Sequence, residues 1–248
     1  MNVQNSLFLF LTILLVNCSS PNYTKTANVE KSSMGVSTDM RADAEAVATI
    51  LPYKVKLDAE MNEVIAEASM DLVKPFDNKE STLGNFSTNL ILVEARKYFP
   101  TDFAVLTIGG LRVSIDKGDV TLRKVYELMP FDNELVVLGV KGDIAETLIM
   151  RLVEKNNTSL AGVEAKFEGK KLISATINGK PFDKNKVYWL ATTDYLANGG
   201  DYMRFLKESI EKKSTGIKIR DSMIQHFRDL KTAGKKASAE TGKLYEFK

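Results

Sequence analysis

Two residue types that build many protein sites are almost absent from this sequence of 248 residues, which has one cysteine and one histidine. A single cysteine cannot form a disulfide within the chain, and zinc sites made of cysteine and histidine need several such ligands. We therefore expect no metal site and no cofactor. The charges nearly cancel, with 34 Lys and Arg against 32 Asp and Glu, so the basic excess of a typical nucleic-acid binder is missing. We expect no nucleic-acid partner.

The first residues of the chain contain a strongly apolar run. Residues 7–16 read LFLFLTILLV, which is too short for a bilayer core that takes roughly 20 residues but is typical of a signal peptide. The run ends in LVNC, which resembles a bacterial lipobox and implies a lipoprotein signal peptide over residues 1–17 with lipid attached to Cys18. An ordinary signal peptide with an incidental cysteine is the alternative. We expect a flexible tether over residues 18–48 and one domain over residues 49–248.

The rest of the chain combines helical and strand-like patterns. Spacing and composition predict helices over residues 41–51, 85–98, 122–128, 142–155 and 221–230, and another that opens at Leu57 and Asp58 and continues through Met61, Val64, Ile65 and Ala68. Strands are predicted over residues 103–107, 135–140, 163–167, 171–177 and 186–193, with a short one marked by Ile217 and Ile219. Asn178 and Gly179 predict a hairpin turn, and residues 194–202 a glycine-rich loop. This mixture predicts an α/β (α+β) fold, with a mixed sheet and flanking helices.

Four short segments lie at the ends of predicted elements or in loops, where binding groups usually sit. They read ESTLGN at 80–85, TIGGLR at 107–112, MPFDN at 129–133 and TDYLANGGD at 193–201. In order and spacing they resemble the C-terminal domain of the bacterial 5'-nucleotidase family, which also includes UDP-sugar hydrolases and 2',3'-cyclic phosphodiesterases. The family's Asn-Gly-Lys-Pro hairpin is matched between the last two segments. The resemblance covers residues 51–206.

The resemblance implies that the domain binds the nucleoside part of a nucleotide. In the family, one aromatic residue from the Pro-Phe-x-Asn turn and another from the loop before Gly-Gly-Asp hold the two faces of the base, and Phe131 and Tyr195 match them. Asn133 matches the residue that hydrogen-bonds the edge of the base. Two aromatic rings can hold any planar base. The alternatives are that Phe131 packs in the core and that Asn133 only caps its own turn.

The same resemblance assigns the polar ends of the ligand. Arg112 matches the family's substrate-binding cation, and Asp201 matches the carboxylate that reaches the ribose hydroxyls. A guanidinium can fork to an oxyanion, and a carboxylate accepts from paired hydroxyls. Gly109 and Gly110 shape the turn before Arg112. The alternatives are a surface arginine for Arg112 and a helix N-cap for Asp201.

The family's hydrolytic chemistry belongs to an N-terminal metallophosphatase domain whose two metals are held by Asp, Asn and several His. With His226 as the single histidine, we expect no catalytic residues here and no activity of the chain alone. The first hypothesis is a nucleotide-recognition subunit of a 5'-nucleotidase-type hydrolase that works with a separately encoded metallophosphatase. The others are a nucleoside-binding envelope lipoprotein and an interaction module with a decayed site. The lipid would be the only membrane contact, placing the protein on the periplasmic side of a bacterial outer membrane.

Overall fold

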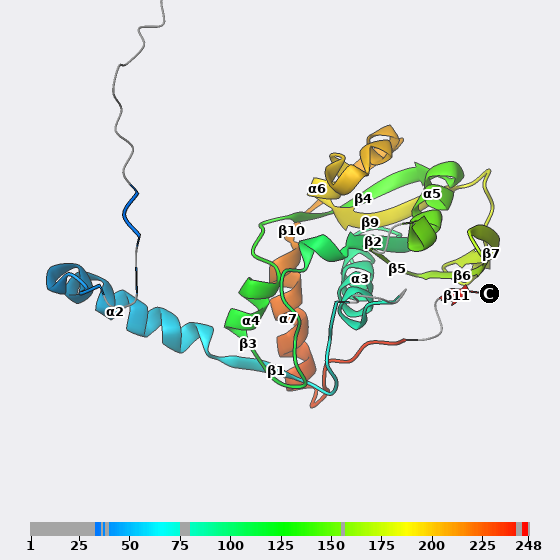
Figure 1. Ribbon diagram of the computed structural model, residues 1–248. Coiled ribbons are helices and arrows are strands. Elements are labelled where there is room, and N and C mark those ends of the chain that lie inside the picture. The colour runs from blue at the N-terminus through cyan, green and yellow to red at the C-terminus, as the bar shows by residue number, and fades with distance from the viewer. Residues whose placement is uncertain are drawn as a thin grey trace, which may run out of the picture. The chain divides into compact units, whose positions relative to one another are not determined.

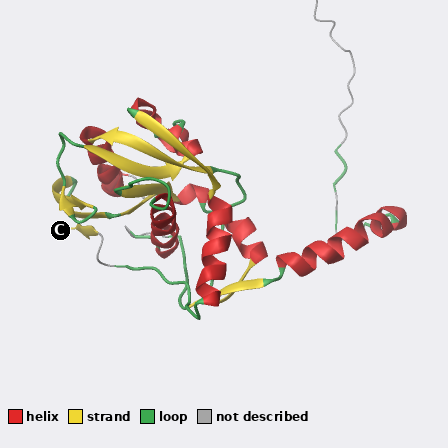
Figure 2. Cartoon of the chain, turned by 180° about the vertical axis from the view of Figure 1, so that it is seen from behind, coloured by secondary structure: helices red, strands yellow, loops and turns green. Residues whose placement is uncertain are grey.

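The computed structural model describes residues 33–35, 37, 40–74, 80–154, 157–241 and 245–247 (Figures 1 and 2). The chain divides into two compact units, residues Met1–Ala48 and Thr49–Lys248. Cys18 and the predicted signal peptide lie outside the described residues, so lipid attachment stays a prediction. No helix in the described part of the chain is long and apolar enough to cross a membrane.

A five-stranded mixed sheet forms the centre of the second unit, with the strands in the order β10-β4-β9-β2-β5. They are β10 (Glu211–Lys218), β4 (Glu134–Lys141), β9 (Val187–Thr193), β2 (Phe103–Thr107) and β5 (Thr158–Ala161). Neighbouring strands run antiparallel, except that β2 and β9 run parallel. Helices cover both faces, so the predicted mixed sheet with flanking helices is confirmed.

The five-stranded sheet separates two parts of the core, as strand β2 illustrates, because alternate side chains of a strand point to opposite faces. Phe103 and Val105 are buried against α5 and α6, whereas Ala104 and Leu106 are buried against α3 and α7. Figure 1 shows α3 and α7 below the sheet and α6 above it. The helices are α3 (Thr82–Ala95), α4 (Leu122–Leu128), α5 (Gly142–Glu154), α6 (Asp194–Ala197) and α7 (Ile219–Thr232).

Two smaller sheets complete the unit. One pairs β1 (Val64–Ala68) with β3 (Gly118–Thr121), and the other has the order β11-β6-β7-β8 with β6 (Val163–Glu168), β7 (Lys171–Ile177), β8 (Lys180–Pro181) and β11 (Tyr245–Phe247). The predicted turn between β7 and β8 is confirmed, since Asn178 and Gly179 both have a left-handed backbone, with φ of 51° and 71°. The hydroxyl of Tyr245 bonds both the N–H and the carbonyl of Leu160, which ties the last strand to the fold.

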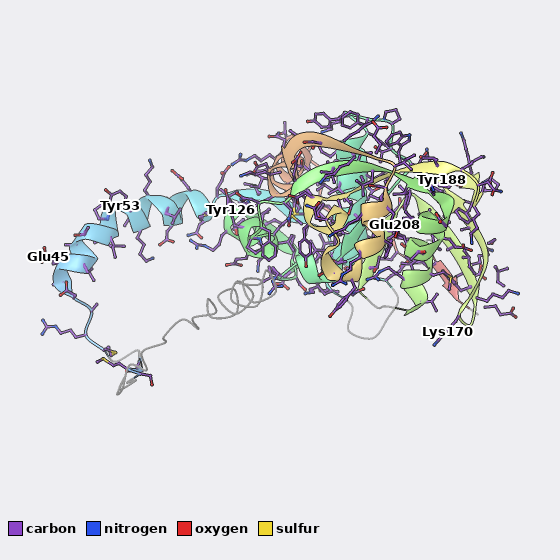
Figure 3. The ribbon with its side chains drawn as sticks, turned by 90° about the horizontal axis from the view of Figure 1, so that it is seen from above. Glu45, Tyr53, Tyr126, Lys170, Tyr188 and Glu208 are labelled. Carbon is purple, nitrogen blue, oxygen red and sulfur yellow. The ribbon has the colours of Figure 1, made fainter. Side chains whose placement is uncertain are left out.

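The helix predicted to open at Asp58 is wrong. Asp58 lies inside helix α2 (Ala44–Met61), which ends three residues later and has no buried residue; Figure 3 labels Tyr53 on it. Residues 64–68 form strand β1, which pairs antiparallel with β3. Ile65, Ala66 and Ala68 are all buried, so their apolar character reflects strand packing rather than a helical stripe.

Several other boundaries differ from the sequence predictions. Helix α3 begins earlier than expected, because the side chain of Ser81 caps it by accepting from the Gly84 N–H at 2.8 Å. Strand β5 was not predicted, and β10 is longer than predicted, with Ile219 opening α7 instead of ending a strand. The predicted loop at 194–202 contains α6. Short 3₁₀ turns are Ile108–Gly110, Gly200–Tyr202 and Arg204–Glu208.

Candidate functional site

One cavity of about 260 Å³ gathers the residues that the sequence motifs single out. Its residues come from the segments that follow β2 and β9 and from the turn that precedes β4. The lining residues are Gly109, Gly110, Arg112, Phe131, Asn133, Tyr195 and Asp201. Three segments that are far apart in the sequence therefore meet at one place. The remaining motif, residues 80–85, does not line the cavity.

The Gly109-Gly110 turn follows β2 and carries Arg112. Gly84 packs closely against this turn, and a side chain there would not fit, because a Cβ at Gly84 would lie 2.6 Å from Cδ1 of Ile108. Arg112 donates from Nη1 to the carbonyl of Gly109 at 3.2 Å, and its Cζ lies 5.9 Å from the centre of the Phe131 ring. This cation–π contact holds the guanidinium beside the aromatic group. The remaining donors of the guanidinium are suited to an anionic or hydroxyl-rich ligand.

The turn that carries Phe131 is fixed by a buried arginine of α7. Arg220 donates to the carbonyls of Met129 at 3.3 Å and Phe131 at 3.4 Å, and it forms an ion pair with Asp132. Lys218 also contacts Asp132, and these two cations hold the pKa of the Asp132 carboxyl below its usual value. Phe131 is 46% exposed, so the alternative that it packs in the core is wrong.

Tyr195 lies in helix α6, just after β9. Its hydroxyl donates to Oδ1 of Asp201 at 3.0 Å. A Cβ at Gly200 would lie only 2.4 Å from Cε1 and Cζ of the ring, so the backbone at Gly200 packs directly against Tyr195. Tyr195 as a whole is 51% exposed. The hydroxyl of Tyr195 is thus held by Asp201 and one side of its ring by Gly200, while much of the residue is accessible to solvent.

Asp201 has a left-handed backbone, with φ of 48° and ψ of 40°, and so does Tyr202 with φ of 62°. Such a conformation is costly for a residue with a side chain and persists where the surroundings impose it. Arg151 of α5, only 7% exposed, donates from Nη2 to the carbonyl of Asp201 at 3.2 Å. Asp201 lies inside a 3₁₀ turn whose N-cap is Gly199, so the N-cap reading of Asp201 is wrong.

The carboxylate of Asp194 links the segment that carries Phe131 to the segment that carries Tyr195. Oδ1 of Asp194 accepts from Nδ2 of Asn133 at 3.0 Å, from the N–H of Glu134 at 3.2 Å and from the N–H of Tyr195 at 2.8 Å. Asn133 therefore does more than cap its own turn. The sequence motifs gave no role to Asp194, Arg151 or Arg220. Of these three residues, only Arg151 gave a signal in the sequence, because it is an arginine on the apolar face of a predicted helix.

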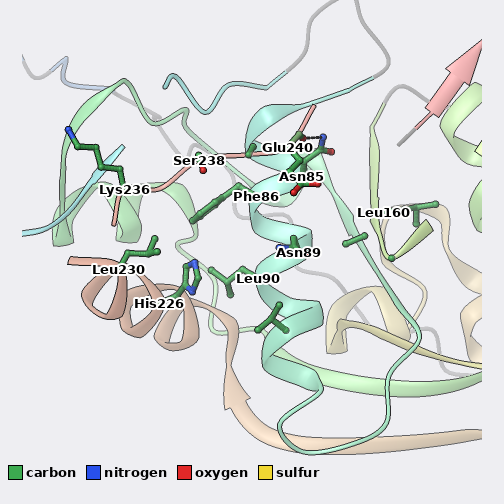
Figure 4. Close-up of a pocket in the computed structure, with 14 residues that line it drawn as sticks. Asn85, Phe86, Asn89, Leu90, Leu160, His226, Leu230, Lys236, Ser238 and Glu240 are labelled. Carbon is green, nitrogen blue, oxygen red and sulfur yellow. Dashed lines mark hydrogen bonds between the residues drawn. The ribbon is translucent and has the colours of Figure 1, made fainter. Parts of the chain in front are cut away.

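A larger cavity of about 360 Å³ lies between α3, α7 and the segment after α7 (Figure 4). It contains none of the predicted site residues. Two of its polar groups are already paired, since Nδ2 of Asn85 donates to the carbonyl of Glu240 at 2.9 Å and Lys236 pairs with Glu67. His226 points across it toward α3, and burial lowers the pKa of its imidazole. The smaller cavity, with its two accessible rings, is the better candidate for ligand binding.

Metal ligands are not gathered at either place. Within the described residues, no group of three or more His, Cys, Asp or Glu side chains is arranged to hold a metal ion. The polar groups at the smaller cavity are one guanidinium, one amide, one carboxylate and one phenol. Such groups can bind and orient a ligand through hydrogen bonds and ring contacts.

Comparison with known proteins finds several that are similar to this chain. The UshA protein of Yersinia enterocolitica is 38% identical over 117 residues, which are 45% of this chain and 21% of that protein. The trifunctional nucleotide phosphoesterase YfkN of Bacillus subtilis is 29% identical over 191 residues, 69% of this chain and 13% of that protein. The crystal structure of a 5'-nucleotidase precursor from Thermus thermophilus matches with a TM-score of 0.69 and 29% identity, covering 82% of this chain and 43% of that one.

Fold and cavity together define an α/β domain in which three segments present two aromatic rings and a few polar groups around one space. The chain belongs to the 5'-nucleotidase family, and its residues 64–208 match the C-terminal domain of that family. The predicted resemblance is thereby confirmed. The chain spans 13% to 43% of the lengths of the relatives named above, so the match concerns one part of each of them.

Proposed function

We propose that this domain binds the nucleoside part of a nucleotide in the smaller cavity. The observation that carries the proposal is the convergence of Phe131, Tyr195, Arg112 and Asp201 on one space. The two rings stack on the base, the carboxylate of Asp201 accepts from the ribose hydroxyls, and Arg112 approaches the anionic end of the ligand. Asn133 contacts the edge of the base. Each of these roles uses a group that the fold already holds in place.

The catalytic step of this proposal belongs to a metallophosphatase centre on a separate chain. One histidine cannot supply the several that such a centre uses. The proposed site is also open, because Phe131 is 46% exposed, Tyr195 51% and the neighbouring Tyr202 90%. An open aromatic site suits a domain that meets a second surface carrying the scissile phosphate. A closed pocket within one chain would have favoured binding without hydrolysis.

The proposed location is the cell envelope, with lipid on Cys18 as the anchor. The support is the apolar run at 7–16, followed after Asn17 by the only cysteine of the sequence. The description of the Thermus thermophilus relative as a precursor is consistent with an exported protein. Metabolic labelling with a palmitate analogue tests the anchor: the label should enter the wild type and be absent from Cys18→Ala.

Calorimetry with adenosine tests the binding role. Phe131→Ala and Tyr195→Ala should each weaken binding roughly 5- to 150-fold, which corresponds to a stacking contribution of about 1–3 kcal/mol. Tyr98→Ala, which removes a ring that is 45% exposed and does not line the cavity, is the matched control and should leave the affinity unchanged. The binding role is wrong if the wild type binds no adenosine even at millimolar concentration.

Phosphate release tests the division of labour. The purified chain alone should release no phosphate from AMP or from a UDP-sugar when divalent metal is added, and turnover should appear once a metallophosphatase chain is supplied. Clear turnover by the chain alone would contradict the subunit role while leaving nucleoside binding intact.

A further inference from the structure

We propose that Asp194 is a positioning residue that turns the carbonyl oxygen of Asn133 toward the ligand, so that the site favours bases that carry an amino group. This inference rests on the proposed function and refines it. It concerns a contact that the sequence motifs leave undefined, because an asparagine amide can either donate or accept.

The orientation of the amide follows from the chemistry of its partner. An ionised carboxylate only accepts hydrogen bonds, so the atom of Asn133 that faces Oδ1 of Asp194 at 3.0 Å must be the nitrogen. Two backbone N–H groups, of Glu134 and Tyr195, also donate to this same oxygen. With three donors converging on it, Oδ1 of Asp194 serves purely as an acceptor. The reverse orientation of Asn133 would set two acceptor oxygens against each other.

The backbone of Asn133 is also held. Its carbonyl accepts from the N–H of Ile219 at 3.0 Å, where α7 begins. The preceding residues of the turn are fixed by Arg220. Asn133 lines the cavity, whereas Asp194 does not, so the amide nitrogen is drawn away from the lining. With one N–H of Nδ2 donated to Asp194, Oδ1 is the acceptor that the amide can offer to a base.

A carbonyl oxygen at this place accepts from the exocyclic amine of adenine or cytosine. It forms no hydrogen bond with a base whose corresponding edge lacks a donor. Adenosine and purine riboside differ only by the amino group, so their affinity ratio isolates this contact. One hydrogen bond of ordinary net strength makes adenosine bind roughly 2- to 12-fold more tightly.

Calorimetric titration of the full chain with both nucleosides tests the proposal. Wild type should show the roughly 2- to 12-fold preference for adenosine. Asn133→Ala should bring the ratio to about 1. Asp194→Asn should also lower it, because the new amide can face Asn133 with either end. Asp132→Asn is the matched control: it loosens the same turn without touching the Asn133 amide, so both affinities should fall together and the ratio should persist.

The outcomes separate this inference from the function beneath it. Equal affinity of the wild type for the two nucleosides, or an unchanged ratio in Asn133→Ala, overturns the inference and leaves nucleoside binding standing. Absence of binding to either nucleoside overturns both. Thermal unfolding of each variant shows whether it is folded, and Asn133→Ala decides the matter if Asp194→Asn does not fold.

Discussion

The backbone of Gly200 packs so closely against the Tyr195 ring that it leaves no room for a Cβ. Because a Cβ at position 200 would lie 2.4 Å from the ring, Gly200→Ala must displace either the ring or the turn. We expect this single methyl group to weaken adenosine binding about as much as Tyr195→Ala, roughly 5- to 150-fold. Tyr195→Phe should have a smaller effect, since it keeps the ring and loses only the hydrogen bond to Asp201. Titration with adenosine measures both.

A second glycine gives the control for this prediction. Gly169 lies in the turn between β6 and β7, with φ of 58° and no atom within 4 Å of the place where a Cβ would lie. Gly169→Ala therefore strains the backbone without a steric clash, and it should lower the melting temperature while leaving adenosine affinity intact. Equal affinities of Gly200→Ala and wild type would show that the ring of Tyr195 does not contact the nucleoside.

At the level of residues, the sequence identified the groups on the surface of the cavity but not those behind it. Phe131 and Asp201 stand in short motifs whose order could be read directly. Arg151, Asp194 and Arg220 act through backbone carbonyls or through another side chain. Their partners are up to 91 positions away in the sequence, and only the fold reveals them. The ligand-binding role of the motif residues stays a prediction.

At the level of elements, the sequence predicts the limits of a helix or strand correctly where the residues of that segment themselves mark its ends. Strands β2 and β7 and helix α4 have the predicted limits. The failures have a common cause. Strand β1 takes its form from β3, and β5 from β2, so pairing with a distant strand overrides weak local spacing. Four residues, Thr158–Ala161, are also too few to show a period.

The contact between α3 and α7 predicts a pH dependence of stability. His226 of α7 lies with its ring centre 5.7 Å from that of Phe86 on α3, and burial is the main cause that lowers the pKa of its imidazole. Among nearby charges, Lys97 lowers this pKa further, whereas Asp229 and Glu94 raise it. The folded chain thus binds a proton less readily than the unfolded chain. Stability is full above the ordinary pKa of 6.5 and is lost as pH falls through the folded value.

Thermal unfolding of His226→Gln measures this effect. Between about pH 7.5 and about pH 5 the melting temperature of the wild type should fall more than that of the variant. The carboxyl of Asp132 does not interfere, because its pKa lies below an ordinary value of 3.8 and it stays ionised over this range. Parallel curves for the two proteins would mean that the imidazole is equally accessible to protons in the folded and unfolded chains.

At the level of the whole molecule, burial begins late in the sequence. Among the described residues, the first buried side chain is that of Ile65, and α2 contributes none. We therefore expect that removing residues 1–48 leaves the second unit, Thr49–Lys248, with a melting temperature within about 2 °C of the full chain and with the same adenosine affinity. Calorimetry of both forms checks this. A larger loss of stability would show that residues before Thr49 contribute to the folded unit.

The strand order β10-β4-β9-β2-β5 has a kinetic consequence. Because β9 inserts between β4 and β2, the sheet can close only after residues 187–193 have found partners at 134–141 and 103–107. Non-local pairing of this kind slows folding. Partly assembled chains lack the cavity, so a nucleoside that binds only the finished sheet draws the population toward it by mass action. If the domain binds nucleoside as proposed, adenosine present during refolding should raise the yield of native protein.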